Sequence, residues 1–263
     1  MGYLLYNLRR LFTVHSGRAE ERPLDFFGQL FNSLSFGVGQ RKVYSKRFTY
    51  ASIMHFLLGW GFIELFFATT VDFFTARGWL VEHLPGFDTP WFATLNDTGG
   101  LMLISGVLMA LGRRHFNKPE KLPQDNISGR GNLLGDSGIL VFLLILCLGG
   151  FLAEAARLAV DQPKTAHFSY VGNAIAHLIS FDTWVILKPN LWWSHALASL
   201  VFIAILPMTK MFHVIAAITN IALTNRQKHG LVKSMNISEI MENPDFDIEN
   251  TSLGANNIKD FSW

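Results

Sequence analysis

Residues 191–220 read LWWSHALASLVFIAILPMTKMFHVIAAITN, an apolar segment long enough to cross a lipid bilayer as one helix. The segment carries two histidines, His195 and His213, which are 18 residues apart. In an unbroken α-helix 18 residues make five turns, so both imidazoles are expected on one helix face, ~27 Å apart along the axis. Pro207 lies between them and is expected to kink the helix. Because ionisable side chains are costly inside a membrane, both histidines are functional candidates.

The composition of the 263-residue chain is typical of a membrane protein, with 50% hydrophobic and 16% charged residues. Three further apolar segments are long enough to span a bilayer, at residues 48–71, 91–111 and 137–158. Residues 168–179 have the length of a short surface helix. The sequence therefore predicts an all-α integral membrane bundle of about four transmembrane helices, with one short surface helix. The single cysteine, Cys147, excludes an internal disulfide and an iron–sulfur cluster held by this chain alone.

Basic residues are distributed unevenly along the chain. Lys and Arg concentrate near the N-terminus and in the connector at 113–136, whereas the loop at 72–94 is poor in them. The positive-inside rule therefore predicts that both termini and this connector lie in the cytoplasm. The expected organisation is an interfacial N-terminal segment (1–47), a membrane domain (48–225) and a cytoplasmic tail (226–263). The net charge of +2 gives no indication of a nucleic acid partner.

A third histidine, His55, extends the pattern to the first predicted span. It lies eight residues after Arg47, ~12 Å along the helix from the inner basic cluster. His213 lies near the inner end of the last span, which runs in the opposite direction, so these two histidines are expected at similar depth. Histidines facing each other on antiparallel helices can supply both axial ligands of a haem b. A chance match in depth between two structural histidines is the alternative interpretation.

Other polar side chains in the predicted spans have more than one interpretation. His195 is expected near the outer surface, where it either ligates a second haem or lines a quinone pocket. Glu154, near the outer end of the third span, is then a candidate to accept protons from a quinol. Arg157 follows it by three residues and is expected to neutralise it. Glu64 lies on the opposite helix face from His55 and is expected to be protonated or paired, or to belong to a proton path.

Lys210 precedes His213 by three residues and lies on nearly the same helix face. It either holds a haem propionate or extends along the helix to the inner membrane surface. No partner for His195 is evident in the spans. His177 and His83, in the outer loops, are candidates only if those loops fold inward.

Several motifs resemble those of a known prokaryotic family. They are Trp192-Trp193-x-His195, Ile203-Ala204, Pro207-x-x-Lys210-x-x-His213 and Asn220 in the last span, and Gly39-Gln40-Arg41-Lys42, Met54-His55-Phe56 and Trp60-Gly61-Phe62 earlier. Over roughly residues 35–263 the chain resembles the nitrate-reductase-gamma-like membrane domain of heterodisulfide-reductase-related iron–sulfur proteins. That group includes membrane-bound electron-transfer-flavoprotein:quinone oxidoreductases. By this resemblance His55 and His213 match one haem ligand pair and His195 matches the outer ligand, although a second histidine on the first span is missing.

The resemblance implies a membrane subunit with one or two haems b, located in a prokaryotic cytoplasmic membrane. It would pass electrons between membrane quinone and a cytoplasmic iron–sulfur protein or domain, with an electron-transfer flavoprotein as a further partner. In that family a segment like Met235–Trp263 leads into a ferredoxin-like domain, so the chain is expected to be part of a longer protein or to bind a cluster-bearing subunit. Two alternatives stay open: a non-redox membrane anchor or small transporter with structural histidines, and a haem-binding protein without quinone chemistry.

Overall fold

The computed structural model describes residues 26–41, 43–44, 46–76, 86–116, 134–222 and 242, and every regular element within these ranges is a helix. The chain divides into two compact units. One consists of Gln40–Phe212, and the other of Met1–Gly39 together with His213–Trp263. The predictions for the chain before residue 26, for His83, for most of the 113–136 connector and for nearly all of the tail lie outside the described residues.

Four helices of the Gln40–Phe212 unit are long and apolar enough to cross a membrane. They are α3 (Thr49–Ala76), α4 (Pro90–His115), α5 (Gly135–Asp161) and α7 (Phe181–Ile205). A short helix, α6 (Tyr170–Ala176), lies in the connection between α5 and α7. The predicted all-α bundle of four apolar spans, with a short helix within residues 168–179, is therefore confirmed.

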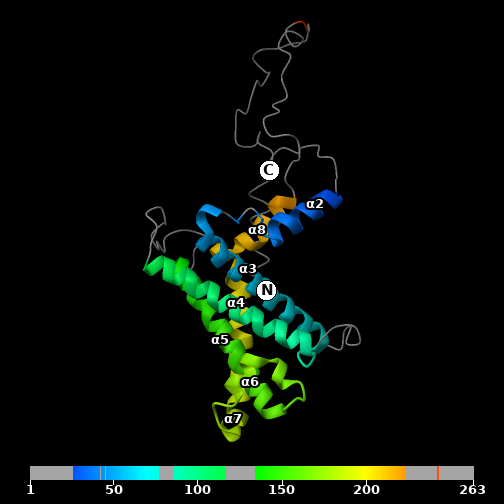
Figure 1. Ribbon diagram of the computed structural model, residues 1–263, viewed down its shortest axis with the longest axis vertical. Helices are drawn as coiled ribbons and strands as arrows, with labels where there is room; N and C mark the ends of the chain where they lie inside the picture. Colours follow the sequence, from blue (N-terminus) through cyan, green and yellow to red (C-terminus); the bar gives the residue numbers. More distant parts are fainter. Residues whose placement is uncertain are drawn as a thin grey trace. The chain divides into compact units, whose positions relative to one another are not determined.

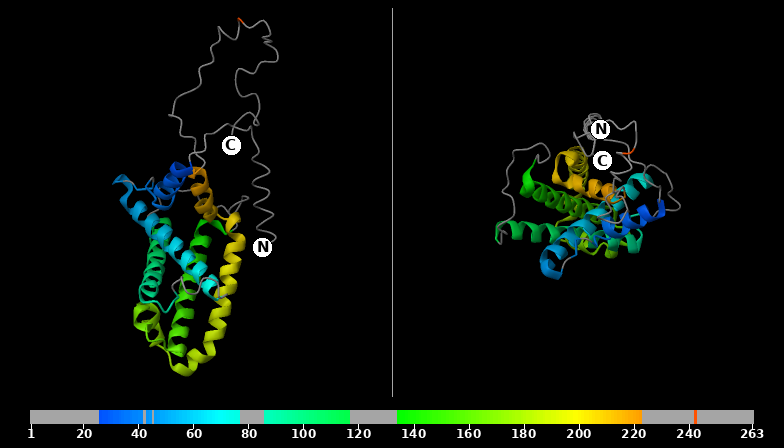
Figure 2. Two further views of the ribbon diagram at one scale, coloured as in Figure 1. Left: turned by 90° about the vertical axis from the view of Figure 1, so that its right-hand side faces the viewer. Right: turned by 90° about the horizontal axis from the view of Figure 1, so that it is seen from above.

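The four long helices pack side by side (Figure 1). α3 packs on α4, α4 on α5, and α5 on both α6 and α7. Figure 2 shows α6 at one end of this bundle. The ring of Phe202 on α7 contacts Phe62 on α3 and Phe142 on α5, with centroid distances of 6.0 and 5.9 Å, so three helices meet in one apolar core.

Glycines allow α3 and α4 to approach each other closely. A Cβ atom added at Gly61 would lie 2.5 Å from the backbone nitrogen of Leu103, and one at Gly106 would lie 2.6 Å from that of Leu58. Small residues are typical of membrane helix contacts, where packing and not water exclusion drives association. This crossing fixes the level of His55, which precedes Leu58 by less than one turn.

The last span differs from the prediction at its start. α7 begins at Phe181, ten residues before Leu191, because residues 181–190 continue the helix through Pro189. His195 is consequently 14 residues, or ~21 Å, from the first residue of α7. The prediction that His195 lies near the outer end of the span is therefore wrong, since the residue occupies the middle of the helix.

The same span also differs at its end. α7 is followed by a 3₁₀ turn at Leu206–Met208, and the residue after that turn has extended backbone angles. Pro207 has no N–H to continue the helical hydrogen bonds, so it ends the helix here instead of kinking it. A new helix, α8, covers His213–Ala222. The prediction that His195 and His213 share one face of an unbroken helix is therefore wrong.

The described part of the other unit is small. It contains α2 (Phe26–Asn32), a π-helix at Ser33–Val38, and α8, which packs on both. A Cβ atom added at Gly37 would lie 3.2 Å from Cγ1 of Ile218, so a glycine permits this contact. His213 is the first residue of α8.

Candidate functional site

His55 on α3 is held by a hydrogen bond to Gln40. Nδ1 of the imidazole lies 3.0 Å from Oε1 of the amide. Because an amide oxygen can only accept, Nδ1 carries the proton and the lone pair of the ring is on Nε2. Metal-bound histidines commonly donate their second ring N–H in this way, which fixes the ring and raises its basicity. His55 therefore has the tautomer and the support expected of an iron ligand.

Gln40 is placed by the turn that precedes α3. Its φ of +52° is in the left-handed region, and its carbonyl accepts a hydrogen bond from the N–H of Val43 at 2.9 Å. The residue is buried. Its amide lies over Gly59, one turn after His55, where any Cβ atom would overlap the amide nitrogen. A glycine slot on α3 thus accommodates the amide that orients His55.

His195 on α7 lies against a pair of glycines in the middle of α5. A Cβ atom at Gly149 would lie 3.4 Å from Nδ1 of the imidazole, and one at Gly150 would lie 3.3 Å from Cε1. Nδ1 is buried and has no hydrogen-bond partner among the described residues. His195 therefore presents a buried ring nitrogen that is available to a ligand.

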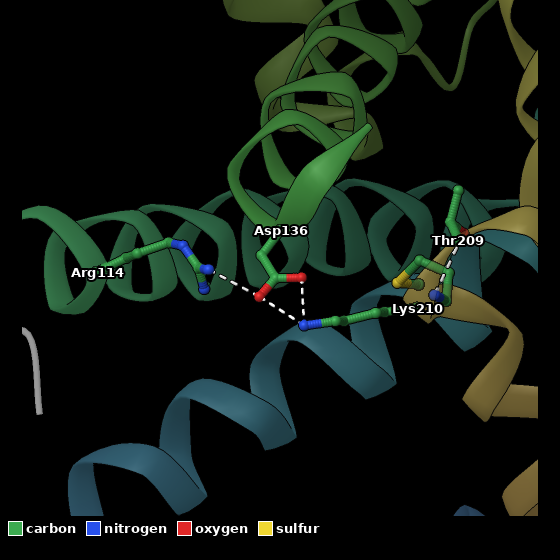
Figure 3. Close-up of polar contacts among 5 residues, drawn as sticks. Arg114, Asp136, Thr209 and Lys210 are labelled. Atoms are coloured by element: carbon green, nitrogen blue, oxygen red, sulfur yellow. Dashed lines mark hydrogen bonds and ion pairs between the residues drawn. The ribbon is translucent and has the colours of Figure 1, made fainter. Parts of the chain in front are cut away.

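Lys210 is held by an ion pair. Its ammonium lies 2.6 and 2.7 Å from the two carboxylate oxygens of Asp136, at the start of α5. Arg114, at the end of α4, contacts the same carboxylate at 2.7 Å (Figure 3). One carboxylate therefore joins α4, α5 and the segment after α7. The haem-propionate role of Lys210 stays a prediction, and it would require Lys210 to be shared with Asp136.

Two carboxyl groups meet inside the bundle at the end where α6 lies. Asp97 on α4 is 0% exposed, and its Oδ2 accepts hydrogen bonds from the N–H groups of Val171 at 2.5 Å and Gly172 at 3.4 Å. The carboxyl of Glu154 on α5 lies close to that of Asp97, since a Cβ atom at Gly172, whose N–H reaches Asp97, would be 2.7 Å from Oε2 of Glu154. Oδ1 of Asp97 and Oε1 of Glu154 are buried and have no hydrogen-bond partner among the described residues.

A third carboxyl, that of Glu64 on α3, lies next to this pair. A Cβ atom at Gly99 would overlap the Glu64 carboxyl, so a glycine on α4 provides its space. Asp97 is close enough for its charge to act on Glu64. The predicted neutralisation of Glu154 by Arg157 is not formed as an ion pair, because Arg157 contacts Oδ1 of Asp88 at 2.8 Å while Glu154 turns toward Asp97.

The predicted site residues are divided between the two units. His55 and the carboxyl cluster belong to the Gln40–Phe212 unit, whereas His213 belongs to the other unit. The pairing of His55 with His213 on one iron therefore stays a prediction. Within the described ranges, no three His, Cys, Asp or Glu side chains are grouped in a way that would hold a metal ion.

Sequence reasoning did not assign a role to Gln40, Asp97 or Asp136. Gln40 lies in the Gly39–Lys42 motif, but nothing in the sequence places it beside His55. Asp97 had a usable signal, since it is a carboxyl residue within an apolar span and such residues are functional candidates by default. Asp136 had none, because its two cationic partners are far away in the chain.

Comparisons with known proteins give one relative. No protein-family model matches the chain, and no solved structure matches it at a significant level. A protein of Syntrophomonas wolfei named EtfAB:quinone oxidoreductase is 26% identical to the chain over 241 residues. The match covers 87% of this chain and 31% of the relative, so the chain spans about a third of the relative's length. The chain therefore has a distant homologue named as a quinone oxidoreductase.

Proposed function

We propose that this chain is the haem b-carrying membrane part of a quinone-linked oxidoreductase. The observation that carries the proposal is the hydrogen bond from Nδ1 of His55 to Gln40, inside a helix apolar enough to span a membrane. An axial haem ligand needs this support, because the second ring nitrogen must be held while the first faces iron. The relative named EtfAB:quinone oxidoreductase supports the same class of function.

Each histidine has a role in this proposal. His55 would supply one axial ligand and His213 the other. His195 would either ligate a second haem or bind the quinone, and its buried Nδ1 beside Gly149 and Gly150 fits both roles. A bound haem would supply one-electron chemistry, while the protein orients the imidazoles and keeps water away from them.

The quinone would bind along α5, between His195 and Glu154. Gly150, which contacts His195, precedes Glu154 by four residues, or ~6 Å along the helix. A quinone ring on this stretch would meet an imidazole nitrogen on one side and a carboxyl on the other. Glu154 would accept the proton that a quinol loses when it is oxidised.

The partner on the other side of the electron path would be a cytoplasmic iron–sulfur protein or domain. A single cysteine cannot hold such a cluster, which commonly takes four thiolates, so the clusters would lie outside these 263 residues. The name of the relative points to an electron-transfer flavoprotein as a further partner. In this proposal both termini lie on the cytoplasmic side of a prokaryotic membrane, as the positive-inside rule predicts from the basic N-terminal region.

Haem content and spectrum test the proposal. Protein purified in mild detergent should show a reduced-minus-oxidised spectrum of low-spin haem b, at one or two haems per chain. His55→Ala and His213→Ala should each lose the same haem, while the control His167→Ala should keep it, because His167 lies in the turn Ala166–Phe168 outside the long helices, with its ring against Phe168. Wild-type protein without haem, or a normal spectrum in either ligand variant, would contradict the proposal.

A further inference from the structure

The carboxyl pair of Asp97 and Glu154 has no cation in contact with it among the described residues. The charged groups that face this pair are Glu64, on which the charge of Asp97 acts, and Arg157, whose charge acts on Glu154 although its ion pair is with Asp88. Asp72 is near Arg157 in turn. From α7, the imidazole of His195 lies about one turn away along α5. If Asp97 and Glu154 were both ionised, the two neighbouring buried carboxylates would repel each other strongly.

One proton bound to the pair removes this repulsion, because only one of the two carboxyl groups is then charged. Two carboxyl oxygens come within hydrogen-bonding reach only when one of them carries a proton. Asp97 receives two backbone N–H groups, which stabilise a negative charge, whereas no backbone N–H among the described residues is bonded to Glu154. A proton shared by the pair is therefore better placed on Glu154.

Glycines on the neighbouring helices leave the space that these carboxyl groups occupy. A Cβ atom at Gly172 of α6 would lie 2.7 Å from Oε2 of Glu154, so a glycine leaves the space the carboxyl occupies. Glu64 fills the corresponding space beside Gly99. The three carboxyls thus follow one another across α5, α4 and α3, in the order Glu154, Asp97, Glu64.

We propose that Glu154, Asp97 and Glu64 form a proton relay that leads away from the quinone site, from α5 across α4 to α3. This inference rests on the proposed function. Oxidation of one quinol releases two protons, and its two electrons go to the redox centre that the proposed function supplies. The Asp97–Glu154 pair holds one proton and one negative charge, so it takes up one further proton from a quinol hydroxyl and passes one to Glu64 before it accepts the second. Quinone reduction runs the same steps backwards.

Infrared spectroscopy and quinol kinetics on the same purified, haem-loaded protein test the relay. The wild type should show a protonated-carboxyl band that shifts in D₂O, and both Asp97→Asn and Glu154→Gln should remove or displace it. Either variant should slow haem reduction by quinol by about 10²-fold, the range of a lost acid–base group, with haem content unchanged. Glu64→Gln is a second variant that leaves the buried pair intact and should also slow the reaction.

Asp161→Asn is the matched control. Asp161 is a carboxyl on the same helix α5, but it is exposed and pairs with Lys188. This variant should keep both the infrared band and the quinol rate. Normal quinol rates in Asp97→Asn and Glu154→Gln, or an infrared band that both variants retain, would overturn the relay while the proposed function stands. A wild type whose haem does not react with quinol would overturn the proposed function, and the relay with it.

Discussion

The two ends of the Gln40–Phe212 bundle differ in whether their buried carboxyl groups contact cations. At the end where α6 lies, Asp97, Glu154 and Glu64 gather without a cation in contact, as far as the described residues extend. At the other end, the carboxylate of Asp136 forms ion pairs with both Arg114 and Lys210. α4 and α5 each contribute to both ends, since their polar groups are 17 and 18 residues apart, or ~26 and ~27 Å.

This difference separates structural from functional polar groups. A carboxylate between two cations compensates the cost of its burial and fixes the ends of three segments. A group of carboxyls without a cation gains no such compensation, and it is tolerated only with protons bound. The His55–Gln40 hydrogen bond lies in the half of the bundle that holds the paired charges, where rigid geometry favours an oriented ligand.

The largest expected effect on stability is that of Asp136→Asn. It leaves Arg114, whose side chain is 11% exposed, beside Lys210 without the shared counter-charge. Breaking a mostly buried pair in this way should lower the free energy of unfolding by about 3 kcal/mol, as measured by denaturant titration in mixed micelles.

Two further variants compare the effect on stability of removing a carboxylate elsewhere in the bundle. Asp97→Asn should leave the free energy of unfolding unchanged or raise it, because it removes a buried charge that has no cation. Asp161→Asn breaks the exposed pair with Lys188 and should cost at most about 1 kcal/mol. A larger loss of stability in Asp97→Asn than in Asp136→Asn would show that the assignment of the two ends is wrong.

The next effect concerns the oriented ligand. Gln40→Leu removes the acceptor from Nδ1 of His55 and should weaken haem binding about 10- to 100-fold, the usual cost of losing such support. Haem titration of the apoprotein measures this. Gln40→Glu keeps an acceptor at the same place and should retain affinity, so equal weakening by both variants would argue against an orienting role.

The smallest effect is expected from an added methyl group. Gly172→Ala should push the Glu154 carboxyl away from Asp97 and lower the free energy of unfolding by about 1 kcal/mol. Gly112→Ala is the control, because a Cβ atom at Gly112 meets nothing within 4 Å. That variant should be neutral or slightly stabilising, as alanine favours a helix. Equal effects of the two substitutions would mean that Gly172 does not position Glu154.

Hydrophobic run lengths were sufficient to predict the four spans and the short helix. They did not place the start of α7, because Lys188, Pro189 and Asn190 read as loop residues although the helix continues through them. The effect of Pro207 was underestimated, since a proline can either kink or end a helix and only the surrounding packing decides which.

The candidate site was predictable only in part. His55, His195 and Glu154 stood out because polar groups in apolar spans are rare. Gln40 did not, because its role depends on a contact between separate segments of the chain, and Asp97 was passed over although it met the same criterion. Glu154 illustrates this point, since its sequence neighbour Arg157 suggested an ion pair whereas the folded chain turns it toward Asp97.

Quinol-driven reduction of the haem is the most direct test of the proposed electron path. Purified protein in lipid vesicles would be mixed with a reduced short-chain quinol, and haem absorbance would be followed with time. The wild type and the Asp161→Asn control should be reduced at the same rate, and His55→Ala should show no reducible haem signal. A wild-type protein whose haem is reduced by dithionite but not by quinol would contradict a role in quinone-linked electron transfer.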